Sequence, residues 1–275
     1  MPAPAPTLDL DAIAADVLSA LATHRQIPAF SHAPGGLTLA DAYRVPPLLR
    51  AAFEARGETI TGRKIGFTNR AMWKVYGVAA PIWGYCTDRT TYQLETTPVQ
   101  RVRDFAEPRI EPEIMFGLGK APSRQMTESD LLDCIDWVAF GYEMVQSIFP
   151  DWKFAAADTV AANALHGTLL VGERHPIAPR KAAWQRELAN FSVELECDGK
   201  PSQTGGGALV LDSPLLALRH LVELLADDPH NQPLRAAEII STGTLTLAMP
   251  VSAGQTWTTR ARGIPLADIT IRFEA

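Results

Sequence analysis

RIEPEIMFGL, residues Arg109–Leu118, is the most informative segment of this chain. Its polar and apolar residues alternate, which predicts a β-strand whose every second side chain points to the same face. Glu111 and Glu113 would then point together, with Arg109 beside them. Two carboxylates on one face repel each other unless a positive group joins them. A divalent cation that prefers oxygen ligands, Mg²⁺ or Mn²⁺, is one solution, and a solvated strand face with Arg109 as partner is the other.

A third acidic residue adds to this pattern. Glu143 lies in the strongly apolar run Phe140–Ile148. A carboxylate buried in such a run needs a partner, because an unpaired buried charge costs several kcal/mol. Glu143 is therefore a candidate third metal ligand, and the alternative is that it caps a helix or faces water.

The segments around this strand predict an α+β fold, because strands outnumber helices after residue 60 and do not alternate with them one for one. The sequence predicts a helical N-terminal subdomain over residues 1–60 and a core with a mixed, rolled or sandwiched sheet over residues 61–275. Helices are predicted over 8–24, 38–56 (with a fresh start near Pro46), 129–138 and 214–226. Further strands are predicted over 59–67, 82–86, 140–148, 168–172, 189–197, 238–246 and 267–273.

Composition and charge exclude several classes of protein. The chain has 275 residues, of which 47% are hydrophobic and 20% charged, so it is neither disordered nor fibrous. Its formal net charge of −6 disfavours nucleic acid and membrane surfaces as partners. The three cysteines form no CxxC pair, which favours a reducing compartment. The proline-rich start, residues 1–7, lacks the features of a signal peptide, and no apolar run is long enough for a membrane span, so a cytoplasmic location is expected.

Short motifs in collinear order over about residues 40–275 give the chain a specific resemblance. It resembles the 2-keto-4-pentenoate hydratase and 4-oxalocrotonate decarboxylase group of the fumarylacetoacetate hydrolase superfamily. That resemblance implies a mixed β-roll or sandwich core of the fumarylacetoacetate hydrolase C-terminal type. The matching segments are GRKIGFT (62–68), WGYCTD (83–88), RIEPE (109–113), EMV (143–145), DWKF (151–154), ADTVAAN (157–163), TGGG (204–207), PLLAL (214–218) and LRAAEIISTG (234–243).

The resemblance also assigns roles to individual residues. It implies that Glu111, Glu113 and Glu143 bind Mg²⁺ or Mn²⁺, and that Lys64 and Asp88 share the acid–base chemistry. Asp158 lies in a matching segment and Thr244 directly follows one, and both are candidates for binding the substrate. Arg63 and Arg109 are further candidates, because an acidic protein that binds an acidic substrate needs positive groups at its site. The turn from Ser241 to Thr244 would close over the substrate carboxylate.

The implied activity is a lyase reaction. A 2-oxo acid can chelate a metal ion through its carboxylate and 2-oxo oxygens, and the ion then stabilises an enolate. The first expectation is a hydratase that adds water to a 2-hydroxy-2,4-dienoate or 2-oxo-enoate in aromatic or sterol catabolism. Three alternatives remain: a decarboxylase of a 2-oxo-3-enedioate, an acylpyruvate C–C hydrolase, and a non-catalytic subunit of a hydratase–decarboxylase complex. A homo-oligomer is also implied.

The chain departs from the pattern of this group at two segments, one of which, Leu211–Pro214, lacks the usual Leu-Gly-His/Asn-Pro form. At the other, the group usually reads Ala-Asp-Asn-Ala-Ser, whereas this chain has Ala162 in place of the acid, Leu165 in place of the hydroxyl, and His166 directly after them. His166 is either a new pocket group or a structural histidine. Cys86 has no evident histidine partner in the sequence, so a packing role is expected for it.

Overall fold

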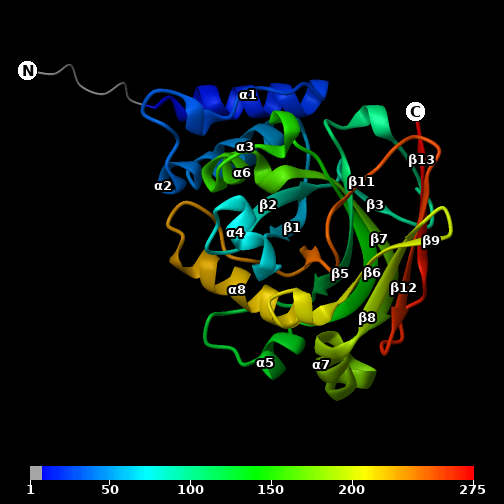
Figure 1. Cartoon of the computed structure of the whole chain (residues 1–275). Coiled ribbons are helices and arrows are strands. Elements are labelled where there is room, and N and C mark those ends of the chain that lie inside the picture. The colour runs from blue at the N-terminus through cyan, green and yellow to red at the C-terminus, as the bar shows by residue number, and fades with distance from the viewer. Residues whose placement is uncertain (1–7) are drawn as a thin grey trace, which may run out of the picture.

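The computed structural model describes residues 8–275, so the proline-rich start lies outside the described residues (Figure 1). No helix among residues 8–275 has the length and apolar character needed to cross a bilayer. The helices are α1 (Leu10–Thr23), α2 (Leu39–Ala42), α3 (Val45–Ala55), α4 (Trp73–Tyr76), α5 (Glu128–Leu132), α6 (Ala156–Ala161), α7 (Lys181–Asn190) and α8 (Pro214–Asp227). The strands are β1 (Ile60–Gly66), β2 (Ile82–Thr87), β3 (Thr91–Gln93), β4 (Val99–Arg101), β5 (Arg109–Leu118), β6 (Ile135–Val145), β7 (His166–Pro176), β8 (Ser192–Cys197), β9 (Lys200–Gly206), β10 (Ile239–Thr244), β11 (Met249–Pro250), β12 (Thr256–Arg262) and β13 (Ile269–Glu274).

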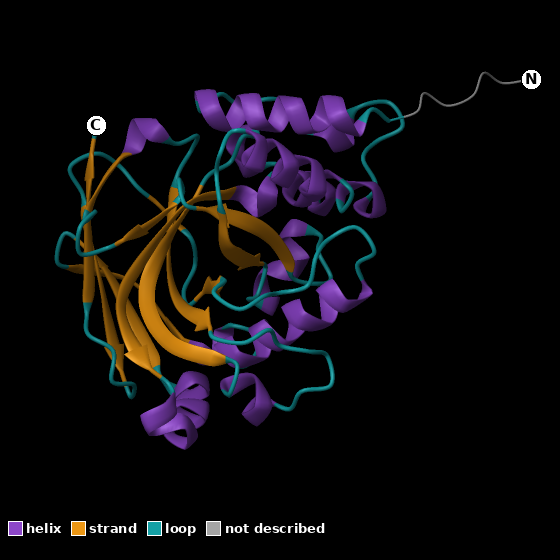
Figure 2. Ribbon diagram, turned by 180° about the vertical axis from the view of Figure 1, so that it is seen from behind, coloured by secondary structure: helices purple, strands orange, loops and turns teal. Residues whose placement is uncertain are grey.

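The strands form two curled sheets, which confirms the predicted α+β class with a mixed core (Figure 2). The larger sheet has the order β2-β1-β10-β5-β6-β7-β3, and β11 pairs with β5. The smaller sheet has the order β4-β13-β12-β8-β9. The pairs β1–β10 and β7–β3 are parallel, whereas the pairs β10–β5, β5–β6 and β6–β7 are antiparallel. The strand that carries Glu111 and Glu113 therefore lies near the centre of the larger sheet.

The two sheets share an apolar layer. Tyr142 of β6 and Leu170 of β7 pack with Trp257 and Ile271 of the smaller sheet in one buried cluster. The hydroxyl of Tyr142 lies 2.9 Å from the Thr259 hydroxyl and donates to the Ile269 carbonyl at 2.9 Å, so its polar end is satisfied between the sheets. This layer fixes the outer face of β6 and leaves its other face to the site.

Helices cover the end of the larger sheet formed by β1 and β2 (Figure 1). Val17 of α1, Leu49 of α3 and Trp83 of β2 belong to one continuous buried cluster. Asp158 of α6 accepts hydrogen bonds from the Ser31 amide (2.8 Å) and hydroxyl (2.6 Å), which fastens the N-terminal helices to the region around the site. The division of the chain at residue 60 stays a prediction.

Two predicted elements are placed differently in the structure. The helix predicted over 129–138 ends at Leu132, because the apolar residues from Ile135 onward form β6 instead. The strand predicted over 189–197 starts only at Ser192, since α7 runs on to Asn190. Short apolar runs fit either a buried helix or a buried strand, so periodicity alone did not separate them.

Candidate metal centre and adjoining pocket

Three carboxylates meet on one face of β5 and β6. Glu111 and Glu113 are two residues apart on β5 and share a face. Glu143 on β6 lies directly opposite Glu111 in the antiparallel register. One carboxylate oxygen from each residue lies within 4.8 Å of the others. The structure thus brings the predicted metal ligands together.

Glu113 is fully buried and is held through one of its two oxygens. Its Oε2 accepts hydrogen bonds from the Ser241 hydroxyl and from the Gly243 amide, the latter at 2.9 Å. Gly243 has a φ of +102°, and a Cβ there would lie 1.9 Å from the Thr68 hydroxyl, so this turn requires glycine. Glu113 Oε1 has no hydrogen-bond partner among the described residues, although it is buried. It is therefore available to a cation.

Glu143 is also fully buried, and each of its oxygens faces a different residue. Its Oε1 lies 2.7 Å from His166 Nδ1. Its Oε2 lies 3.2 Å from Lys64 Nζ as an ion pair. Like Glu113, Glu143 therefore has one oxygen held firmly and one turned toward the shared centre.

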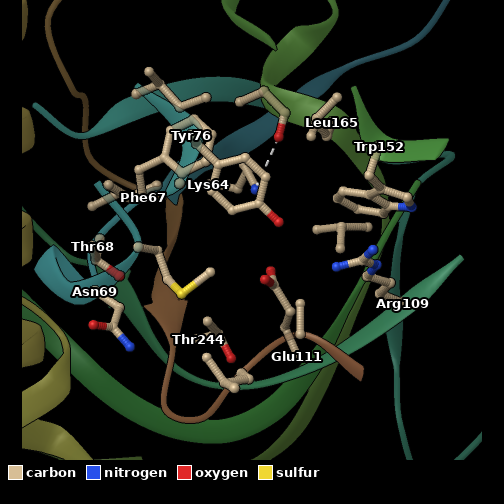
Figure 3. A pocket seen from close by; sticks show the side chains of 18 of the residues that line it. Lys64, Phe67, Thr68, Asn69, Tyr76, Arg109, Glu111, Trp152, Leu165 and Thr244 are labelled. Atoms are coloured by element: carbon tan, nitrogen blue, oxygen red, sulfur yellow. Dashed lines mark hydrogen bonds between the residues drawn. The ribbon is translucent and has the colours of Figure 1, made fainter. Parts of the chain in front are cut away.

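Lys64 is the cation of this cluster. It lies on β1 and is buried, and its Nζ donates to the Ala164 carbonyl at 3.0 Å (Figure 3). Burial by itself would lower the pKa of Lys64, but Coulombic attraction from Glu143, Glu111 and Glu113 outweighs it and raises the pKa. In the metal-free chain Lys64 is therefore an ammonium group.

A strained turn, residues 163–165, positions the two partners of Glu143, which are Lys64 and His166. Asn163, Ala164 and Leu165 all have positive φ, at 53°, 52° and 61°. The left-handed region costs a non-glycine residue roughly 1–2 kcal/mol, so the surrounding contacts must hold this turn in place. The Asn163 side chain does so by accepting from the Tyr85 amide (2.7 Å) and donating to the Tyr85 carbonyl (2.9 Å). The turn then presents the Ala164 carbonyl to Lys64 and leads directly into His166.

The electrostatics of the cluster fit a divalent cation. Burial raises the pKa of Glu111 to about 7, with a further rise from Glu143 that Lys64 and Arg109 oppose. Burial, together with Glu143 and Glu111, raises the pKa of Glu113 well above its usual value. Three carboxylates and one ammonium carry a net charge of about −2 when all are ionised. A carboxylate-only donor set with unpaired buried oxygens is the kind that holds Mg²⁺ or Mn²⁺.

A pocket of about 200 Å³ opens beside Glu111. Figure 3 shows Lys64, Glu111, Arg109 and Thr244 around it. The Arg109 guanidinium stacks over the Trp152 ring at 4.1 Å and has no carboxylate within ion-pair distance among the described residues. Thr68 and Asn69 add polar groups. The rest of the wall is mainly apolar and includes Phe67, Met72, Tyr76, Ile82, Phe154 and Leu165.

Three residues expected at the site lie elsewhere. Arg63 neighbours Lys64 on β1 and so points to the opposite face, where it pairs with Glu238 at 2.8 Å under the Tyr85 ring. Asp88 is exposed in the turn after β2 and accepts from the Thr59 amide at 2.9 Å. Asp158 is the buried acid that caps α6 and binds Ser31. None of these three lines the pocket.

Other residues contribute in ways that the motifs did not reveal. Ser241 and Gly243 were expected over the substrate carboxylate, but they bind Glu113, and only Thr244 of that turn lines the pocket. Cys86 does have a histidine nearby, since its Sγ lies 4.0 Å from His166 Nδ1. Burial, with Glu143, raises the pKa of the Cys86 thiol, which keeps it neutral in a packing role. Pairings such as these depend on strand register, which local sequence does not encode.

Comparison with known proteins agrees with this geometry. Residues 70–272 match the family model described as fumarylacetoacetate (FAA) hydrolase C-terminal. The chain is 31% identical to 2-hydroxyhexa-2,4-dienoate hydratase of Comamonas testosteroni over 79% of its own length and 80% of that protein. It is 30% identical to a 4-oxalocrotonate decarboxylase of a Pseudomonas species over 94% of its length and 97% of that protein.

A solved structure is also similar over almost the whole chain. It is 4-oxalocrotonate decarboxylase from Pseudomonas putida G7 complexed with magnesium and adipate. The two share 28% sequence identity with a TM-score of 0.87, and the match covers 97% of this chain and 99% of that one. That related protein binds magnesium in the same fold.

Proposed function

The chain belongs to the fumarylacetoacetate hydrolase family, and we propose that it is a metal-dependent hydratase of a 2-hydroxy-2,4-dienoate or 2-oxo-enoate in aromatic or sterol catabolism. One observation carries the proposal. Glu113 and Glu143 are each held through one oxygen, while the other oxygen faces a shared centre beside Glu111 and the Lys64 ammonium. This centre adjoins a largely apolar pocket.

The three glutamates would hold Mg²⁺ or Mn²⁺. The chemistry of the donor set supports this assignment, since it consists only of carboxylate oxygens and contains no sulfur. When bound, the cation supplies the positive charge that stabilises an enolate developing on a 2-oxo acid. It also offsets the repulsion between the carboxylates.

Lys64 would move the proton in this reaction. Its Nζ lines the pocket, and the Ala164 carbonyl fixes its direction. A cation on the glutamates neutralises the charges that hold the pKa of Lys64 high, so burial would then favour the neutral amine. The group could thus accept a proton from the substrate and return one to it. Asp88 has no part in this step, because its exposed side chain lies in a turn outside the pocket.

The pocket favours a monocarboxylate with a short apolar tail. Arg109 and Thr244 would bind the substrate carboxylate next to the metal centre. The tail would then lie against apolar side chains such as Phe67, Tyr76 and Ile82. A second carboxylate placed there would lose hydration with few charged partners, which is unfavourable.

Decarboxylation of a 2-oxo-enedioate is the second candidate. Two observations favour it. The chain is similar to 4-oxalocrotonate decarboxylases over nearly its whole length. The Arg109 guanidinium stacks over Trp152 and forms no ion pair with a carboxylate among residues 8–275. Arg109 could bind a far carboxylate instead of the near one. The same metal centre would serve both reactions, since each needs an enolate to be stabilised.

The remaining alternatives have less support. Hydrolysis of an acylpyruvate would need a histidine–acid pair that activates water, and no histidine lines the described pocket. A non-catalytic partner subunit would have no reason to keep Lys64 together with all three glutamates. We also expect a symmetric homo-oligomer in the cytoplasm.

Product analysis tests the proposal. Purified protein with Mg²⁺ is mixed with 2-hydroxypenta-2,4-dienoate, and the loss of the dienoate ultraviolet absorbance is followed. A 4-hydroxy-2-oxo acid as product supports the hydratase. Release of CO₂ from a 2-oxo-enedioate, with no hydration of dienoates, would make the chain a decarboxylase. Inactivity on both substrates, with no metal bound, would overturn the enzyme assignment.

A further inference from the structure

His166 occupies an unusual position beside the carboxylate cluster. It is the first residue of β7, it is buried, and its Nδ1 lies 2.7 Å from Glu143 Oε1. We propose that His166 is a positioning residue, which holds Oε1 of Glu143 so that Oε2 is directed at the metal ion. The inference rests on the proposed metal centre and assigns a role to the histidine that directly follows the segment in which this chain departs from the group.

The hydrogen-bond partners of His166 determine which nitrogen carries the proton. The Thr90 hydroxyl lies 3.0 Å from Nε2 and accepts from the Thr87 amide at 3.0 Å. The Thr90 hydroxyl can donate to Nε2 or to the Thr87 carbonyl at 3.3 Å, so the position of the imidazole proton depends on Glu143, whose carboxylate oxygens accept. An Nδ1–H group donates to the Glu143 carboxylate, whereas the other neutral tautomer would place a lone pair against it. The carboxylate of Glu143 therefore favours the proton on Nδ1, and the Thr90 hydroxyl is compatible with that arrangement at Nε2.

Glu113 provides an internal comparison. Its Oε2 accepts from Ser241 and Gly243, and its Oε1 remains without a partner. Glu143 is similar in that His166 holds its Oε1, and it differs in that its Oε2 lies 3.2 Å from Lys64 Nζ. Each buried ligand is therefore fixed by donors on one oxygen, and each presents the other to the shared centre. Donors behind a ligand commonly fix its orientation and raise metal affinity.

The backbone explains how a histidine can reach Glu143. The left-handed turn at Asn163, Ala164 and Leu165 immediately precedes it, and the register of β6 and β7 shifts between Met144 and Val145. These irregularities turn the first side chain of β7 toward β6. The turn is itself anchored on Tyr85 by Asn163, so the imidazole has a rigid support.

His166 does not reach the substrate pocket. The described pocket beside Glu111 is lined by Lys64 and Leu165 but not by His166. The imidazole, with Thr90, instead lines a second cavity on its other side, together with residues such as Tyr85 and Gln146. His166 therefore acts through Glu143 and does not contact reacting atoms.

The test compares three substitutions by their affinity for Mn²⁺, measured by calorimetry and by the electron paramagnetic resonance of the free ion. In H166N the amide nitrogen takes the place of Nδ1, because both are bonded to Cγ. In H166Q it takes the place of Nε2, one atom further out. We expect H166A and H166Q to bind Mn²⁺ about 10- to 100-fold more weakly than the wild type, and H166N to bind nearly as well. The partly exposed His220 of α8, changed to asparagine, is the matched control.

The outcomes separate this inference from the metal centre itself. If the wild-type protein binds Mn²⁺ and E113Q does not, the centre is supported independently of His166. Wild-type affinity in both H166A and H166Q would then overturn the positioning role. Equal losses in all three variants, with lower melting temperatures of the metal-free proteins, would also overturn it and make His166 a packing residue. If the wild-type protein binds no Mn²⁺, the proposed centre fails and the inference fails with it.

Discussion

Glu111 and Glu143 lie directly opposite each other on the antiparallel strands β5 and β6. Like charges in this position repel, and burial next to Glu113 strengthens the repulsion. The fold therefore holds the carboxylates in mutual repulsion, and a bound cation would reduce that repulsion. This relationship governs both the stability and the activity expected of the protein.

The first prediction concerns pH and metal. The pKa of Glu111 is raised from 4.5 to about 7, so between these values the folded chain retains a proton that the unfolded chain has lost. Stability of the metal-free protein should thus fall as the pH rises through this window, and Glu113 should act in the same direction. The raised pKa of Lys64 has no effect there, because its contribution is lost only above its usual value of 10.5.

Mg²⁺ must displace these protons in order to bind. We therefore expect it to raise the melting temperature more at about pH 8 than at about pH 5. Thermal unfolding with Mg²⁺ or with a chelator, at both pH values, measures the difference. An equal effect at both would show that the ion binds away from the cluster.

The second prediction concerns Glu113. E113Q keeps the shape of the side chain but removes one of three close negative charges, so the metal-free protein should melt at the same temperature or higher. Mg²⁺-dependent turnover should be abolished. Melting curves and activity assays are compared with E95Q, which changes an exposed glutamate. Full turnover in E113Q would show that Glu113 is not a metal ligand.

The third prediction separates proton transfer from metal binding. K64M removes the ammonium that faces Glu143 Oε2 at 3.2 Å and competes with a cation there. We expect turnover to fall by at least about 100-fold, while Mn²⁺ binds as tightly as before or more tightly. Parallel losses of turnover and affinity would instead make Lys64 an organiser of the metal site.

The fourth prediction tests how the substrate carboxylate is bound. R109M removes the guanidinium but keeps an apolar side chain against Trp152. Losing a charge-assisted hydrogen bond should raise KM for a dienoate about 10-fold or more, with a smaller change in kcat. Steady-state kinetics on a monocarboxylate and a dicarboxylate then show which of them Arg109 recognises. An unchanged KM for both would place Arg109 outside substrate binding.

The fifth prediction tests the turn that carries Ala164. A Cβ at Gly84 would lie 2.2 Å from the Asn163 carbonyl oxygen, so G84A should displace the turn and destabilise the protein by about 1–3 kcal/mol. Activity should fall as well, because Lys64 and Glu143 lose their aligned partners. G57A is the control, since a Cβ there meets no atom within 4 Å and only strains a positive φ. Equal losses of stability and activity in G84A and G57A would mean that the turn accommodates the added Cβ without moving the groups around Glu143.

Local pattern predicted the parts of the site that lie on one strand. The alternation in Arg109–Leu118 gave β5 its bounds and put Glu111 and Glu113 on one face. The same alternation separates Arg63 from Lys64, and it would have excluded Arg63 from the pocket if it had been applied to β1. Motif resemblance alone could not make that distinction.

Contacts between residues that are far apart in the chain could not be predicted from the sequence. Glu143 meets Glu111 only through the register of β5 and β6, and His166 meets Glu143 through a shifted register and a left-handed turn. Asp88 and Asp158 are acids in matching motifs. Each accepts a hydrogen bond from a backbone amide, Asp88 from Thr59 and Asp158 from Ala155. A motif shows that an acid is present, whereas only the fold shows which group it binds.

The turn at Asn163, Ala164 and Leu165 has a consequence for how this protein can diverge. Its backbone positions the partners of both Glu143 oxygens, so a substitution that shifts it alters the ammonium and the imidazole at once. The turn also contributes Leu165 to the pocket wall, whereas Tyr76 and Phe154 of that wall come from α4 and from the loop before α6. Single substitutions at Tyr76 or Phe154 can therefore change substrate preference. A substitution that shifts the turn instead changes several groups of the site at once, so it requires compensating substitutions.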